Sequence, residues 1–239
     1  MAPNQYKITV INKSGLDKTY LLFQTNPTQN EKPSPTVFLN VYQASAIVPK
    51  GEAGAEASFA TFKIVKQWYA VNGTAPSPLG NGVTVSTTQS EEVTLGQGEK
   101  KGSTLALTTI NGDGLNPRFE KDITLAAPNG AYQVKVDKTI KYPSPTHIFI
   151  GLGAPDPLHA NLVVPVASVP ATPSNQFTIW PHNKWYIASG DFQQGTIIDV
   201  QTIGPTQLVD FETGLPSQTF VNNPDGTYSP SGKKTGEAI

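Results

Sequence analysis

Apolar and polar residues alternate along most of this chain in short runs. In YKITVIN, residues 6–12, Tyr6, Ile8 and Val10 would lie on one side of an extended chain and Lys7 and Thr9 on the other. A period of two is typical of half-buried β-strands. Similar runs predict further strands at residues 20–24, 37–43, 83–88, 103–109, 132–136, 147–151, 161–166, 195–200 and 218–223.

Turn-forming residues separate these runs. NKSG, NGDG, APNG, GAPDP and NPDG are typical of tight turns, because Gly, Pro, Asn and Asp adopt the backbone angles that such turns require. The best candidate for a helix is residues 51–68, GEAGAEASFATFKIVKQW, but its glycines and β-branched residues disfavour one. We therefore predict an all-β protein.

Several segments of the first half recur, in the same order, in the second half. YKITV from Tyr6 matches YQVKV from Tyr132, and FKIVKQWYAVNG from Phe62 matches FTIWPHNKWYIASG from Phe177. Phe23 and Phe149 follow Tyr6 and Tyr132 at equal spacing, and STLALTTINGDG loosely matches SQTFVNNPDG. Ordered matches of this kind predict an internal duplication. We expect two tandem β-sandwich, jelly-roll-like units, residues 1–126 and 127–239, packed together with a cleft between them.

Composition excludes few classes of function. The 239 residues have a net charge of −1, and Arg118 is the one arginine among the basic residues, so we expect no nucleic-acid partner. The chain has no Cys, and no stretch of 18 apolar residues that would predict a membrane span. Its start, MAPNQYKITV, does not resemble a signal peptide. We expect a cytoplasmic protein without a membrane partner; secretion and a homo-oligomer stay open.

The most distinctive stretch for chemistry is residues 177–191, FTIWPHNKWYIASGD. On a regular strand, Trp180, His182, Lys184 and Tyr186 would share one face. Pro181 cannot donate to a sheet ladder, which suggests an edge or a bulge at that point. We predict that His182 and Lys184 are catalytic groups, a proton shuttle or hydrogen-bond donors, and that aromatic residues hold the ligand. The predicted ligand-binding residues are Trp180, Tyr186, Trp185, Trp68, Tyr69 and His147.

Packing offers a simpler interpretation of several of these residues. The Trp–Tyr pair occurs in both halves, as Trp68–Tyr69 and Trp185–Tyr186, which favours a structural plug in each sandwich. His147 would share a strand face with Phe149 at the border of a core, and His159 would lie in a solvated loop. The histidines show no spacing typical of a metal site, and no nucleotide fingerprint occurs, so we predict neither a metal nor a cofactor.

The opening segment YKITVINKSGLDKTYLLFQTNP, residues 6–27, resembles the N-termini of small, Cys-poor, all-β fungal proteins of natural-product clusters. These include hetero-Diels–Alderases that join a tropolone quinone methide to a humulene-type terpene. The resemblance implies an apolar cleft that orients two flat partners without a cofactor. It covers about the first 25 residues and transfers no catalytic motif to numbered positions.

Three functional hypotheses follow. The first is a cofactor-free cyclase, a hetero-Diels–Alderase-like pericyclase that binds hydrophobic secondary-metabolite intermediates in an apolar cleft. The second is a non-enzymatic, lectin-like carbohydrate-binding or defence protein in which Trp and Tyr stack on sugars. The third is a structural or assembly protein. The residues alone do not decide whether the chain is an enzyme. Burial separates the first two, because a cyclase needs enclosed aromatic residues and a lectin needs exposed ones.

Overall fold

The computed structural model describes residues 5–29, 36–51, 58–159 and 161–231, and these are organised into three β-sheets. The prediction of an all-β protein is confirmed: the helical structure in the described residues is a single 3₁₀ turn, Ile110–Gly112. None of the helical structure described could span a membrane.

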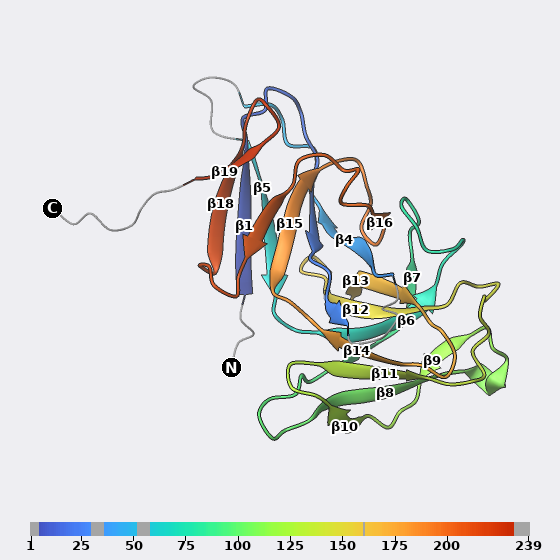
Figure 1. The fold of residues 1–239 in the computed structure, drawn as a ribbon. Coiled ribbons are helices and arrows are strands. Elements are labelled where there is room, and N and C mark those ends of the chain that lie inside the picture. Colours follow the sequence, from blue (N-terminus) through green and yellow to red (C-terminus); the bar gives the residue numbers. More distant parts are fainter. Residues whose placement is uncertain (1–4, 30–35, 52–57, 160, 232–239) are drawn as a thin grey trace.

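A nine-stranded sheet runs through the middle of the molecule (Figure 1). Its order is β17-β15-β2-β4-β13-β12-β6-β7, and β16 pairs with β4 beside this path. The strands, in chain order, are β2 (Tyr20–Gln24), β4 (Phe38–Ala44), β6 (Tyr69–Thr74), β7 (Ser86–Glu92), β12 (Phe149–Pro155), β13 (Val163–Pro170), β15 (Lys184–Ser189), β16 (Ile197–Ile198) and β17 (Gln207–Asp210).

Two smaller sheets pack against different parts of this central sheet (Figure 1). One has the order β19-β18-β1-β5 and consists of β1 (Gln5–Asn12), β5 (Phe59–Val65), β18 (Ser217–Asn222) and β19 (Tyr228–Pro230). The other has the order β10-β8-β11-β14-β3, with β9 paired to β8. Its strands are β3 (Thr28–Gln29), β8 (Gly102–Thr109), β9 (Pro117–Phe119), β10 (Thr124–Ala127), β11 (Tyr132–Val136) and β14 (Gln176–Trp180).

Strand pairing repeats between the two small sheets. β1 pairs antiparallel with β5 and parallel with β18, and β11 pairs antiparallel with β14 and parallel with β8. The register repeats as well, because Tyr6 faces Ile64 and Tyr132 faces Ile179. In the central sheet, β2 lies between β4 and β15, as β12 lies between β13 and β6. These counterparts are what a duplication predicts; the common origin of the halves stays a prediction.

The halves nevertheless exchange strands. β18, from the second half, completes the sheet of β1, and β8, from the first half, completes the sheet of β11. The strand β10 itself crosses the expected boundary between residues 126 and 127. That boundary therefore does not divide the sheets. The reason is that one edge of β1 pairs with the parallel strand β18 of the second half, and one edge of β11 pairs with the parallel strand β8 of the first half.

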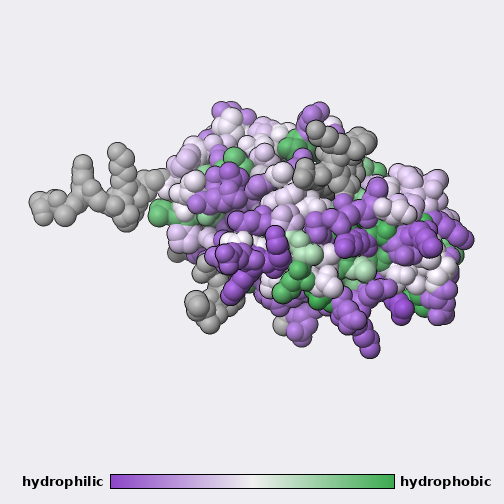
Figure 2. Space-filling view, turned by 60° about the horizontal axis from the view of Figure 1, so that its bottom comes forward, coloured by the Kyte–Doolittle hydropathy of each residue, from purple (hydrophilic) through white to green (hydrophobic). Residues whose placement is uncertain are grey.

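One large apolar core joins the layers. It includes Ile8 and Phe62 of one small sheet, Val134 and Phe177 of the other, and Leu22 of the central sheet. Buried tyrosines add polar links between layers: the Tyr20 hydroxyl donates to Asn222 Oδ1 at 3.1 Å and the Tyr132 hydroxyl to the Gly151 carbonyl at 3.0 Å. The face shown in Figure 2 is largely hydrophilic, with small apolar areas between. The core is therefore enclosed between the sheets.

Candidate functional site

The stretch that looked most distinctive in the sequence is not one strand. β14 ends at Trp180 and β15 begins at Lys184, and the two belong to different sheets. Residues 181–183 carry the chain from one sheet to the other. The alternation that would place Trp180, His182, Lys184 and Tyr186 on one face therefore breaks at Pro181, where a ladder donor is missing.

Trp180 covers a turn of the second half. Its indole Nε1 donates to the carbonyl of Asn129 at 3.0 Å, and a Cβ on Gly130 would come within 3.3 Å of its Cδ1. Gly130 has a φ of +75°, a conformation that favours glycine. Trp180 thus packs on the APNG turn with part of its ring exposed.

His182 and Lys184 lie in a charged cluster. The His182 ring contacts Thr28 Oγ1 through Nε2 at 2.8 Å and Glu212 Oε1 through Nδ1 at 3.4 Å. Lys184 Nζ lies 3.2 Å from Asp210 Oδ2 and 3.3 Å from Glu212 Oε2. Hydrogen bonds to Asp210 and Glu212 raise the pKa of Lys184. Burial raises the pKa of Glu212, but hydrogen bonds from the Asn183 N–H and Lys184 outweigh it and leave that pKa lowered. Lys184 is therefore a cation already neutralised by two carboxylates.

The remaining aromatic candidates mostly serve packing. Trp185 is fully buried, donates from Nε1 to Asn183 Oδ1 at 3.2 Å, and its ring centroid lies 4.9 Å from that of Tyr42. Trp68 is buried in the same core, and Tyr186 packs on Phe23 at 5.5 Å. Two of the three tryptophans thus offer no exposed stacking surface, which disfavours the lectin-like hypothesis.

Tyr69 and His147 are separated from the charged cluster. Tyr69 is half-buried on β6, and burial, with the Glu92 carboxylate, raises its pKa. His147 precedes β12 and lies in a turn with a φ of 45°, where its N–H donates to the Ser144 carbonyl at 3.1 Å. The prediction that His147 shares a strand face with Phe149 is wrong, because the strand begins only at Phe149.

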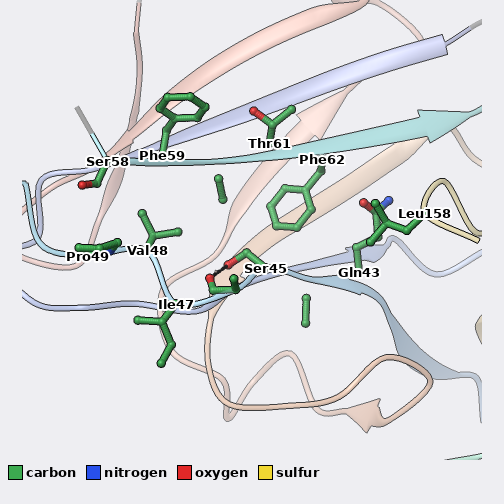
Figure 3. A pocket seen from close by; sticks show the side chains of 13 residues that line it. Gln43, Ser45, Ile47, Val48, Pro49, Ser58, Phe59, Thr61, Phe62 and Leu158 are labelled. Carbon is green, nitrogen blue, oxygen red and sulfur yellow. Dashed lines mark hydrogen bonds between the residues drawn. The ribbon is translucent and has the colours of Figure 1, made fainter. Parts of the chain in front are cut away.

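A cavity of about 520 Å³ lies elsewhere, between the end of β4 and the first residues of β5 (Figure 3). Polar and apolar groups contribute about equally to its wall. The lining residues are Gln43, Ala44, Ser45, Ala46, Ile47, Val48, Pro49, Ser58, Phe59, Ala60, Thr61, Phe62 and Leu158. The predicted site residues do not line it.

The second edge of β5 faces this cavity. The Asn12 N–H donates to the Ser58 carbonyl, and the ladder then pairs Val10 with Ala60. Backbone groups of successive strand residues point to opposite sides. Those of Phe59, Thr61 and Lys63 therefore point away from β1. Among the described strands, β5 pairs with β1 alone.

The corresponding edge in the second half is covered. β14 is the counterpart of β5, and β3 pairs with it through Thr28 and Gln29. In the first half, Leu158 is the residue that the described part of the turn after β12 contributes to the cavity wall. The cavity thus lies beside β5 at the position that β3 occupies beside β14. The two halves differ at this position, and the difference leaves space for a binding site in the first half.

Comparison with known proteins identifies the family. A family model described as RhiA matches residues 3–230. The chain belongs to the RhiA family. The match includes both halves, so the unit that RhiA describes spans all three sheets. No curated protein and no solved structure matches the chain.

The described residues also bear on metal binding. Within residues 5–29, 36–51, 58–159 and 161–231, His, Asp and Glu side chains nowhere form a group of three or more suited to hold a metal ion. The charged cluster at His182 contains Lys184, whose ammonium would repel a cation. The cavity between β4 and β5 is the candidate site.

Proposed function

We propose that this protein binds an apolar small molecule in the cavity between β4 and β5 and acts on it as a cofactor-free cyclase. The observation that supports this proposal is the cavity itself. Its volume falls within the roughly 300–1,000 Å³ of small-molecule sites, which typically combine apolar walls with a few placed polar groups. On the side of β5 that faces the end of β4, Phe62 and Leu158 supply apolar contacts and Gln43 and Ser45 supply polar ones, whereas Phe59 and Thr61 lie on the other side of β5 at the rim of the cavity (Figure 3).

A pericyclic reaction suits such a site. It needs two flat partners held in a reactive pose, and ideal alignment can lower a barrier by roughly 7–11 kcal/mol. A hydrogen-bond donor that polarises a carbonyl adds electrostatic stabilisation of the transition state. The aromatic ring of Phe62 provides a wall for a flat molecule. Nothing in this scheme requires a nucleophile from the protein.

The reaction class rests on the resemblance of residues 6–27 to the hetero-Diels–Alderases. This segment lies within the residues 3–230 that the RhiA family model matches. The segment also contributes directly to the framework of the site, because β1 pairs with β5 along the cavity wall.

Calorimetric titration with a humulene-type terpene tests the binding step. Phe59 and Leu158 are largely exposed, at 60% and 76%, so their truncation leaves the core intact. We expect Phe59→Ala and Leu158→Ala to weaken binding about three- to tenfold, because each removes apolar contact area. Leu215→Ala is the matched control: Leu215 is 71% exposed and lies outside the cavity.

Turnover is tested with a tropolone quinone methide precursor and the same terpene, with the adduct quantified by mass spectrometry. We expect adduct formation above the protein-free rate and a parallel loss in the two cavity variants. Equal binding by wild type, the cavity variants and the Leu215 control would contradict the site. Binding without any acceleration would leave a small-molecule binder and reject the cyclase.

A further inference from the structure

Asparagine followed by glycine is the dipeptide most prone to spontaneous deamidation. Glycine has no Cβ, so its backbone nitrogen can come close to the side chain of the preceding asparagine. The chain contains this dipeptide at residues 72–73, 81–82, 111–112 and 129–130, all of which the structure describes. The reaction needs an asparagine side chain that can turn towards the glycine nitrogen, and a main chain that can rotate to let them meet. The structure shows which of these pairs meets both needs.

The pair at 72–73 is locked inside the central sheet. Asn72 is fully buried on β6, and Gly73 pairs with Phe149 of β12. The backbone is also crowded there, because a Cβ on Gly73 would lie 2.0 Å from the Ser86 carbonyl oxygen. The main chain cannot rotate at this point unless the strands separate.

The pair at 81–82 is held at both reacting groups. The Gly82 N–H donates to the Ile197 carbonyl at 2.8 Å, and Asn81 Oδ1 accepts the Asp199 N–H at 3.1 Å. Both hydrogen bonds tie the pair to a distant part of the chain, so both have to break before the groups can react.

The pair at 129–130 is held in the same way. The Gly130 N–H donates to the Gly96 carbonyl at 2.8 Å, and Asn129 Oδ1 accepts the Gly98 N–H at 3.1 Å. Trp180 covers this turn as well, through its hydrogen bond to the Asn129 carbonyl.

Asn111 and Gly112 lie in the 3₁₀ turn between β8 and β9, and both are exposed. Within the described part of the chain, the Asn111 side chain makes no hydrogen bond, and no group outside this turn accepts the Gly112 N–H. No packed strand has to move for the main chain to rotate here, and exposed turns open at little cost in free energy. This pair therefore meets both needs of the reaction.

We propose that Asn111 is the residue of this protein that deamidates in the folded state. The Gly112 nitrogen gives up its proton and bonds to Asn111 Cγ, while the Cγ–Nδ2 bond breaks and ammonia leaves with that proton. Water then opens the resulting succinimide at either carbonyl, which leaves aspartate or isoaspartate at position 111. The net reaction consumes water and releases ammonia, so it needs no oxidant or reductant. The inference is independent of the proposed function, because Asn111 does not line the cavity.

Peptide mapping by mass spectrometry, after storage of the full-length protein in mildly alkaline buffer, tests the proposal, with fragment ions locating each modified residue. We expect Asn111 to convert at least about tenfold faster than Asn72, Asn81 and Asn129 in the folded protein. In urea, where strands and hydrogen bonds are lost, the rates should agree within about threefold. Storage in water labelled with heavy oxygen should place the label in the product at position 111.

Gly112→Ala should slow conversion of Asn111 about tenfold, because the added Cβ shields the attacking nitrogen. Gly82→Ala is the matched control. Gly82 and Gly112 both have a positive φ, +83° and +68°, and at both an added Cβ would have no atom within 4 Å. The control variant carries a similar strain but should leave the rate at Asn111 unchanged. Thermal unfolding checks that both variants are folded.

Three outcomes would overturn the inference. The first is a folded protein in which Asn81 or Asn129 converts as fast as Asn111. The second is conversion of Asn111 in urea alone. The third is an unchanged rate at Asn111 in folded Gly112→Ala, which would show that the glycine nitrogen does not attack.

Discussion

At the scale of single residues, Asp156 holds the turn that borders the cavity. Its side chain is buried and accepts the Leu158 N–H at 2.8 Å, His159 Nδ1 at 3.0 Å and Gln194 Nε2 at 3.4 Å. Burial raises the pKa of this carboxyl, but the hydrogen bonds from Leu158, His159 and Gln194 outweigh it, and the pKa is lowered. Because Leu158 lines the cavity, Asp156 also sets part of the cavity wall.

This geometry makes the contribution of Asp156 dependent on pH. A carboxyl whose folded-state pKa lies below its unfolded value stabilises the fold above the unfolded pKa, about 3.9. That stability is lost as the pH falls through the folded pKa. We expect Asp156→Asn to lower the free energy of unfolding at pH 7 by about 1–3 kcal/mol, and the difference from wild type to shrink towards pH 2.

Urea unfolding at several pH values measures this effect. Among the described residues, the exposed Asp122 makes no hydrogen bond through its side chain, and Asp122→Asn should change stability by less than about 0.5 kcal/mol. An Asp156→Asn difference that is the same at pH 7 and pH 2 would contradict the role of the carboxylate.

At the scale of strands and sheets, the charged cluster at His182 is better explained as a link between strands than as a catalytic site. It joins Lys184 of β15 to Asp210 at the end of β17, and His182 to Thr28 of β3. The ion pairs are partly exposed, so solvent and salt weaken them.

We expect Lys184→Met to lower the free energy of unfolding by less than about 1 kcal/mol, with a smaller loss at 1 M salt. The variant should keep its ligand binding and any turnover, because Lys184 does not line the cavity. Denaturation at low and high salt, together with the cyclase assay, checks both outcomes. Loss of turnover in a folded Lys184→Met protein would instead support the prediction that Lys184 is catalytic.

The centre of β12 has no room for a side chain. A Cβ at Gly151 would lie 1.9 Å from the Ala167 carbonyl of β13, so any larger residue forces the two strands apart. We expect Gly151→Ala to destabilise the protein by at least about 2 kcal/mol. At Gly80 the nearest atom would be 3.9 Å away, and Gly80→Ala should be nearly neutral. Similar melting temperatures for the two variants would show that β12 and β13 can separate without cost.

At the scale of the whole molecule, the exchange of strands makes the halves interdependent. Without β18, the strand β1 loses its parallel partner. Without β8, the strand β11 loses its parallel partner in the same way. Each missing strand would leave apolar surface and an unpaired edge exposed to water.

We therefore expect residues 1–126 and 127–239, made separately, to show no cooperative thermal unfolding. The two fragments made together should associate and recover a single transition. Circular dichroism and size-exclusion chromatography measure both results. A sharp independent unfolding transition of either fragment would show that it forms a complete unit by itself.

The local alternation of residues was enough to predict most of the strands. β1, β11 and β18 fall where the period of two indicates, because successive side chains of a strand point to opposite faces. The ordered matches between the halves likewise anticipated that β1 and β11, and β5 and β14, have equivalent partners. The alternation failed between Trp180 and Lys184, where the chain changes sheets at Pro181.

The pairing of distant strands, and with it the candidate site, was decided by the tertiary structure. A period of two shows which face of a strand is buried but not which strand lies at its edge. The sequence therefore indicated neither that β18 pairs with β1 nor that, among the described strands, β5 pairs with β1 alone. The one local signal was a polar Gln43 at the end of an apolar run, and its meaning depends on Lys63, which reaches it only when β4 and β5 pack together.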